Sequence, residues 1–178
     1  MDWDAAYSNV DAVADAARFP PRYAAQAQAF RESLGPRFRA GIAYGEAARE
    51  RFDLALPEGT PKGLAMFIHG GYWRRFSKDD FSHMAASAVE HGWAVAVPSY
   101  TLCPEGTVPG ITRQMRAALI RAAEEIPGPI RIAGHSAGGH LATRLACTDV
   151  DLPEDAVEVR RRGEDVASDA LGEFVPTA

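Results

Sequence analysis

Short apolar segments recur along this chain and alternate with segments of helical periodicity. The apolar runs are residues 64–68, 93–97 and 130–133, and the segments 81–88 and 111–126 repeat apolar side chains every three or four residues. A strand without polar alternation is typical of a parallel sheet that is covered on both faces. The pattern therefore predicts an α/β fold, with a mostly parallel sheet and helices on both faces.

Other local sequence patterns predict a further strand, a further helix and the residue at which a helix begins. Residues 50–56 alternate apolar and polar side chains and predict a half-buried strand. Helical spacing predicts a helix over 23–34, and Pro20–Pro21 is expected to end a helical stretch before it. Ser77 and Asp80 predict a capping box, in which a hydroxyl and a carboxylate accept hydrogen bonds from the first free amides of a helix.

Length and composition limit the function classes open to the chain. It has 178 residues, of which 47% are hydrophobic and 24% charged, as in a soluble single-domain protein. No basic patch indicates nucleic acid, no apolar run approaches the roughly 18 residues of a membrane helix, and no histidine–cysteine spacing indicates a metal site. The acidic N-terminus lacks the pattern of a signal peptide, so we expect a cytoplasmic protein.

The chain changes character near residue 149. Residues 149–178 contain nine acidic residues against three arginines and no convincing strand, whereas the preceding 148 residues are nearly balanced in charge. We expect 1–148 to form the N-terminal part of one domain. We expect 149–178 to be an atypical, poorly ordered acidic tail.

Residues 134–138 read Gly-His-Ser-Ala-Gly, between the apolar run 130–133 and a helical stretch. A Gly-x-Ser-x-Gly sequence in a strand–turn–helix context is typical of a nucleophile elbow, in which the serine hydroxyl projects from the edge of a sheet. Gly134 and Gly138 leave room for the tight turn. Ser136 is therefore the candidate nucleophile.

A serine nucleophile needs amides that bind the negative charge that develops on the attacked carbonyl oxygen. Small residues around Ser136 allow the Ala137 amide to serve in this way. Gly70 and Gly71 follow the apolar run 64–68, and no side chain blocks the approach to their amides. These amides are expected to complete an oxyanion hole.

The neighbouring ring side chains admit more than one role. His69 opens the glycine loop, and we expect it to support the loop by hydrogen bonding rather than to act as a base. His140 lies one helical turn beyond Ser136, where packing or capping is expected. Tyr72 and Trp73 either line an acyl or aryl pocket, or Trp73 packs beneath the loop.

Residues 69–73 and 134–140 together resemble the α/β-hydrolase superfamily, and within it the kynurenine formamidase and carboxylesterase branch with its His-Gly-Gly-x-Trp loop. Tyr44–Gly45 is also similar to that branch, and the resemblance covers about residues 1–148. It implies hydrolysis of a small ester or N-formyl aryl amide through an acyl-enzyme at Ser136, without a metal or organic cofactor. The oxyanion donors that it implies are Gly70, Gly71, Tyr72 and Ala137, with His69, Trp73, Gly134 and Gly138 as supporting motif residues.

In such hydrolases the chain order is serine, acid, histidine, yet no histidine follows His140 in this chain. The resemblance therefore implies a C-terminally truncated chain that lacks the last strands and the acid and histidine of the triad. Three interpretations stay open. The chain is an impaired hydrolase, a non-catalytic remnant or pseudoenzyme, or part of a split enzyme completed by a second chain.

Without later strands, the strand at 130–133 is expected to become a sheet edge with unpaired backbone groups and an uncovered apolar face. We predict that the isolated chain is poorly soluble, or depends on an oligomer or a second chain that covers this edge. Size-exclusion chromatography and calorimetry test the prediction. A monodisperse monomer that unfolds cooperatively would contradict it.

Overall fold

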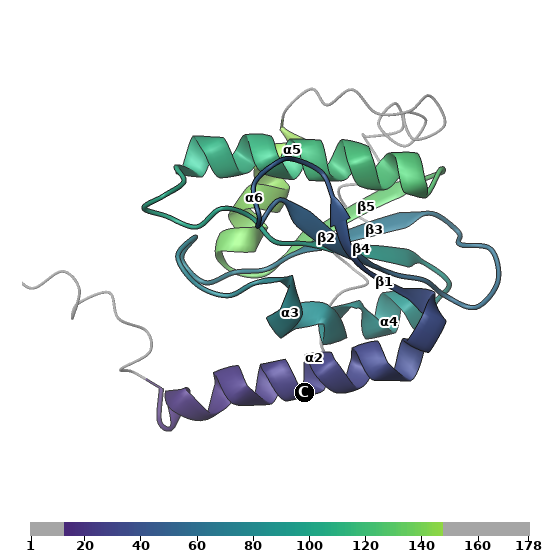
Figure 1. The fold of residues 1–178 in the computed structure, drawn as a ribbon, viewed down its shortest axis with the longest axis horizontal. Coiled ribbons are helices and arrows are strands. Elements are labelled where there is room, and N and C mark those ends of the chain that lie inside the picture. Colours follow the sequence, from purple (N-terminus) through teal and green to yellow (C-terminus); the bar gives the residue numbers. More distant parts are fainter. Residues whose placement is uncertain (1–12, 148–178) are drawn as a thin grey trace, which may run out of the picture.

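The computed structural model describes residues 13–147, so the expectations for the tail 149–178 lie outside the described residues. Figure 1 shows a sheet between two layers of helices. The strands are β1 (Phe38–Ala43), β2 (Arg51–Ala55), β3 (Leu64–Ile68), β4 (Ala94–Pro98) and β5 (Ile130–Gly134). The α-helices are α2 (Phe19–Leu34), α3 (Lys78–Phe81), α4 (Ala86–Glu90), α5 (Val108–Glu125) and α6 (Ala137–Ala146), with short 3-10 turns at Ala16–Arg18, Gly35–Arg37 and Ser82–Ala85.

The five strands within residues 13–147 lie in the order β1-β2-β4-β3-β5. Only β2 runs against the others: it pairs antiparallel with β1 and β4, whereas β3 pairs parallel with β4 and β5. The carboxyl ends of β3, β4 and β5 therefore meet at one edge of the sheet. Helices α5 and α6 cover one face and α2, α3 and α4 the other (Figure 1), which confirms the predicted α/β architecture.

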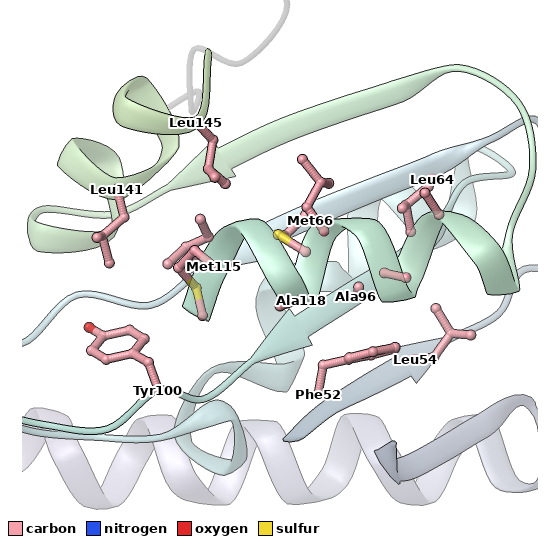
Figure 2. Close-up of a cluster of buried hydrophobic side chains, with 14 of the residues drawn as sticks. Phe52, Leu54, Leu64, Met66, Ala96, Tyr100, Met115, Ala118, Leu141 and Leu145 are labelled. Atoms are coloured by element: carbon pink, nitrogen blue, oxygen red, sulfur yellow. The ribbon is translucent and has the colours of Figure 1, made fainter. Parts of the chain in front are cut away.

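Both faces of the central strands are buried, which explains why these strands show no polar alternation. Leu64, Met66 and Ile68 of β3 point into the cluster beneath α5 and α6, whereas Phe67 joins the cluster beneath α2–α4. Every residue of β4 is buried. Figure 2 shows the first cluster, in which α5 and α6 contribute Met115, Ala118, Leu141 and Leu145.

The structure differs from the sequence-based expectations at two N-terminal points. Strand β1 was not predicted, because its residues are largely exposed, Gly41 has a φ of 69°, and its register with β2 shifts between Arg39 and Ile42. The prediction that Pro20–Pro21 ends a helix was wrong. These prolines lie in the first turn of α2, where the missing amide hydrogens have no helical partner to lose.

Within residues 13–147, β5 is an edge strand. It pairs with β3 alone, and Arg131 and Ala133 are exposed, whereas β4 at the centre of the sheet is fully covered. None of the helices within these residues is both long and apolar enough to cross a membrane.

A buried ion pair connects the sheet to α3. The capping box predicted at Ser77 and Asp80 is present and starts this helix. Lys78, in its first turn, places Nζ 3.1 Å from Oδ1 of Asp53 on β2. The Asp53 side chain is 1% exposed, and the Gly41 amide also donates to it. Burial raises the pKa of Asp53 despite these partners.

Replacing Lys78 by Met should leave a buried carboxylate without its cation and lower the free energy of unfolding at pH 7 by about 3–5 kcal/mol. Because the pKa of Asp53 is raised, the protonated carboxyl is favoured as the pH falls, and the loss should be smaller at pH 4.5 than at pH 7. Denaturant unfolding measures both values. The matched variant Lys62→Met replaces an exposed lysine, and an equal loss in both variants would contradict the prediction.

Candidate active site

Ser136 lies in a sharp turn between the end of β5 at Gly134 and the start of α6 at Ala137, as the sequence predicts. Its φ of 53° and ψ of −118° place a residue with a Cβ atom in strained backbone space. The Gly138 amide donates to the His135 carbonyl (2.8 Å), and the His140 amide donates to the Ser136 carbonyl (3.2 Å). These two hydrogen bonds stabilise the strained backbone of the turn, and Ser136 is exposed.

Three glycines allow backbones to meet directly around this turn. A Cβ atom on Gly138 would overlap the carbonyl oxygen of Ile68 at the end of β3, and one on Gly134 would overlap the carbonyl of Gly138. A Cβ on Gly70 would lie 2.6 Å from the His135 carbonyl oxygen and 3.1 Å from Cβ of Ser136. The turn that carries Ser136 is therefore in contact with the loop that follows β3.

The loop after β3 concentrates backbone strain. Gly71 has a φ of 105°, and Tyr72, Trp73 and Phe76 have φ values of 53°, 56° and 73°. Five non-glycine residues among those described have a positive φ, and four of them are Tyr72, Trp73, Phe76 and Ser136. Strain of this kind persists where the surrounding structure fixes it, and it clusters at functional sites.

Long-range hydrogen bonds hold this strained loop in place. The Arg49 guanidinium donates to the carbonyls of Phe76 (2.5 Å) and Tyr100 (2.7 Å), and the Cys103 amide donates to the Trp73 carbonyl (2.8 Å). The loop is therefore tied to the segment between β1 and β2 and to the segment that follows β4.

His69 is fully buried beneath the loop. Its ring lies parallel to Tyr100 with centroids 4.3 Å apart, and parallel to Phe81 at 6.1 Å. Because a carbonyl oxygen only accepts, the contact between Nδ1 and the Gly70 carbonyl at 2.8 Å places a hydrogen on Nδ1. Burial lowers the pKa of His69 to about 4, so the imidazole is neutral near pH 7.

The two histidines next to the turn, His135 and His140, are exposed. The Trp73 ring packs edge-on against His140 with centroids 5.5 Å apart, and it also packs against the core. Tyr72 is 47% exposed. Among the hydrogen bonds within residues 13–147, none reaches the Ser136 hydroxyl, so the structure brings the candidate oxyanion loop to Ser136 without a base bonded to it.

A pocket of about 350 Å³ adjoins the turn through His140. It lies between the N-terminal half of α5 and α6, and Arg113, Arg116 and Arg144 contribute to its lining. The sequence does not display this pocket, because its lining forms only where two successive helices, α5 and α6, pack against each other. No cluster of acidic, histidine or cysteine side chains within the described part of the chain could hold a metal ion.

The strand order, the turn at Ser136 and the glycine loop define an α/β-hydrolase fold, and comparisons with known proteins give the family. The BD-FAE family model matches residues 52–168, so the chain belongs to the BD-FAE family. A solved structure of a candidate thioesterase from Silicibacter sp. TM1040 superposes with a TM-score of 0.81 at 54% identity, covering 86% of this chain and 58% of that one.

Two curated relatives are hydrolases. Kynurenine formamidase of Danio rerio is 34% identical over 113 residues, which are 61% of this chain and 38% of the relative. Isoprenylcysteine alpha-carbonyl methylesterase of Arabidopsis thaliana is 30% identical over 112 residues, which are 58% of this chain and 26% of the relative. The resemblance to the formamidase and esterase branch is thus confirmed, and the chain spans less than half the length of either relative.

The lowered pKa of His69 predicts a specific dependence of stability on pH. Between the ordinary pKa of histidine, about 6.5, and the folded value of about 4, the unfolded chain binds a proton that the folded chain does not. This residue should therefore lower the free energy of unfolding by about 1.4 kcal/mol for each pH unit as the pH falls through this window. Denaturant titrations at several pH values measure the slope.

In His69→Phe the slope should decrease by that amount. The variant His91→Phe, at an exposed histidine, is the matched control for the loss of an imidazole. Equal slopes in all three proteins would contradict a buried, neutral His69.

Proposed function

We propose that this chain carries the nucleophile and the oxyanion hole of a serine hydrolase, with Ser136 as the nucleophile. The observation that carries the proposal is the strained turn at Ser136 in direct contact with Gly70 of the loop after β3. A nucleophile and candidate amide donors from two separate strands are thereby side by side. The formamidase and methylesterase relatives support carboxylic esters or N-formyl aryl amides as the substrate class.

In the proposed reaction, Oγ of Ser136 attacks the substrate carbonyl carbon and its proton passes to a base. The amides of Ala137, Gly70, Gly71 and Tyr72 bind the oxygen as it gains negative charge. The tetrahedral adduct then expels an alcohol or an amine, which takes up a proton, and an acyl-Ser136 ester remains. Water hydrolyses this ester, releases the acid and returns the hydroxyl to Ser136. Gly134 and Gly138 support the turn that carries Ser136, and Trp73 supports the loop after β3.

The three interpretations differ in whether a base accepts the Ser136 proton and in which chain supplies that base. His69 is buried and neutral and donates to the Gly70 carbonyl, which suits support of the loop rather than the role of base. The histidines next to Ser136 in the sequence are His135 and His140. Losing the base of a triad removes most of the rate, although an oxyanion hole alone retains some catalysis. A split enzyme would take its acid and base from a second polypeptide, for which the half-exposed edge of β5 offers a place to pair.

The location, partners and substrate pocket of the protein are part of the proposed function. We propose a cytoplasmic protein that acts on a small molecule, with no nucleic acid or membrane partner. The pocket between α5 and α6 adjoins Ser136 through His140 and is of a size that suits part of such a substrate.

An alkyl fluorophosphonate probe tests the nucleophile, because such probes react with activated serines. We expect labelling of the purified chain at Ser136, located by peptide mass spectrometry, and complete loss of labelling in Ser136→Ala. Ser87→Ala, at an exposed serine of α4, is the matched control and should keep full labelling.

The outcomes separate the interpretations. Labelling of the chain alone supports a hydrolase site whose serine is activated within this chain. Labelling only after a second polypeptide is added supports the split enzyme. A purified, folded chain that resists the probe under both conditions would overturn the proposal in favour of the non-catalytic remnant.

A further inference from the structure

Tyr100 is a buried side chain that the proposed reaction does not use. It follows β4, is fully buried, and lies at the edge of the cluster beneath α5 and α6 (Figure 2). Its ring stacks on His69 with an interplanar angle of 9°. Its hydroxyl donates to the His69 carbonyl at 3.0 Å and lies 3.5 Å from the Gly70 carbonyl. The residue thus contacts the glycine loop from below, 30 or 31 positions away in the sequence.

The two carbonyls that Tyr100 contacts set the directions of two amides. In a planar trans peptide, the carbonyl of one residue and the amide hydrogen of the next point in opposite directions. A fixed His69 carbonyl therefore fixes the Gly70 amide, and a fixed Gly70 carbonyl fixes the Gly71 amide. The second carbonyl also accepts a hydrogen bond from Nδ1 of His69 at 2.8 Å.

Glycine makes this external support necessary. Gly70 and Gly71 have no side chain to restrict their backbones, and Gly71 has a φ of 105°. A peptide unit between two such residues turns easily unless hydrogen bonds hold it. The bonds to the carbonyls of His69 and Gly70 supply that restraint at the point where Gly70 meets Ser136.

We propose that Tyr100 is a positioning residue of the site, whose hydroxyl holds the carbonyl of His69 and thereby orients the Gly70 amide toward the substrate oxyanion. The catalytic role of this orientation depends on the function proposed for Ser136. Burial raises the pKa of Tyr100 and lowers that of His69, so both groups keep their donor hydrogens and stay uncharged around neutral pH.

The variant Tyr100→Phe removes the hydroxyl and keeps the stacked ring. The chain offers a matched control in Tyr44, whose hydroxyl donates to the carbonyl of Ser99 at 2.6 Å and whose pKa burial also raises. Tyr44→Phe removes an equivalent hydrogen bond next to Tyr100 without touching the carbonyls of the glycine loop.

Residual dipolar couplings of ¹⁵N-labelled protein measure the directions of the Gly70 and Gly71 amides without any need for turnover. We expect Tyr100→Phe to change or average the direction of the Gly70 amide, whose preceding carbonyl loses its hydrogen bond, and Tyr44→Phe to leave both directions as in the unsubstituted chain. Unchanged couplings in Tyr100→Phe, or equal changes in both variants, would overturn the proposal.

Two further readouts complete the test. If the chain turns over an aryl ester, kcat should fall at least tenfold in Tyr100→Phe with KM within about twofold, because an oxyanion donor acts mainly in the transition state. A slowly exchanging Tyr100 hydroxyl proton in the unsubstituted chain is expected in any case, and rapid exchange would overturn the proposal even if the variant failed to fold. Reoriented amides in a chain that the fluorophosphonate never labels would leave the role of Tyr100 intact and refute the function proposed for Ser136.

Discussion

Direct contact between backbones, with no side chain between them, is the constraint on which the candidate site depends. Gly138 in the first turn of α6 lies against the carboxyl end of β3, and Gly134 lies against the same turn. A Cβ atom at either position would separate α6 from the sheet. Because α6 is held this close, the chain has only Ser136 and His135 with which to reverse direction, and Ser136 adopts a positive φ.

Packing elsewhere keeps this arrangement rigid. Leu141 and Leu145 anchor α6 in the cluster beneath α5, while Phe67 and Phe81 hold the opposite face of the sheet. The glycine loop rests on this support through neutral groups, since His69 and Tyr100 are both buried and uncharged near pH 7. A site that binds developing negative charge with backbone amides benefits from such preorganised dipoles.

Much of the fold could be predicted because local patterns reflect burial directly. The apolar runs at β3 and β4 mark strands covered on both faces, and Ser77 with Asp80 marks the start of α3. Strand β1 could not be found in this way, because its residues are mostly exposed and its pairing with β2 is irregular. The sequence also left the strand order open, since order depends on contacts between segments that are distant in the chain.

The candidate site likewise combines features that local sequence patterns predict with contacts between distant segments that they do not. Ser136 and the glycines around it form local motifs that the sequence displays, whereas the support of the loop by Tyr100 and Arg49 becomes visible only when distant segments meet. Whether Trp73 lines a pocket or packs beneath the loop could not be decided from the sequence, because both roles suit an aromatic residue there. The structure shows Trp73 against the core and against His140.

The claim that glycine contacts set the conformation of Ser136 can be tested most directly by the crystal structure of Gly138→Ala. The neighbouring Gly139→Ala serves as the reference, because a Cβ there meets its nearest atom, the Gly134 carbonyl oxygen, at 3.3 Å. If these contacts set the conformation, Gly138→Ala displaces α6 from β3 and Ser136 leaves its positive φ, whereas Gly139→Ala keeps both. A Gly138→Ala structure with α6 in place and φ of Ser136 still near 53° would contradict this dependence.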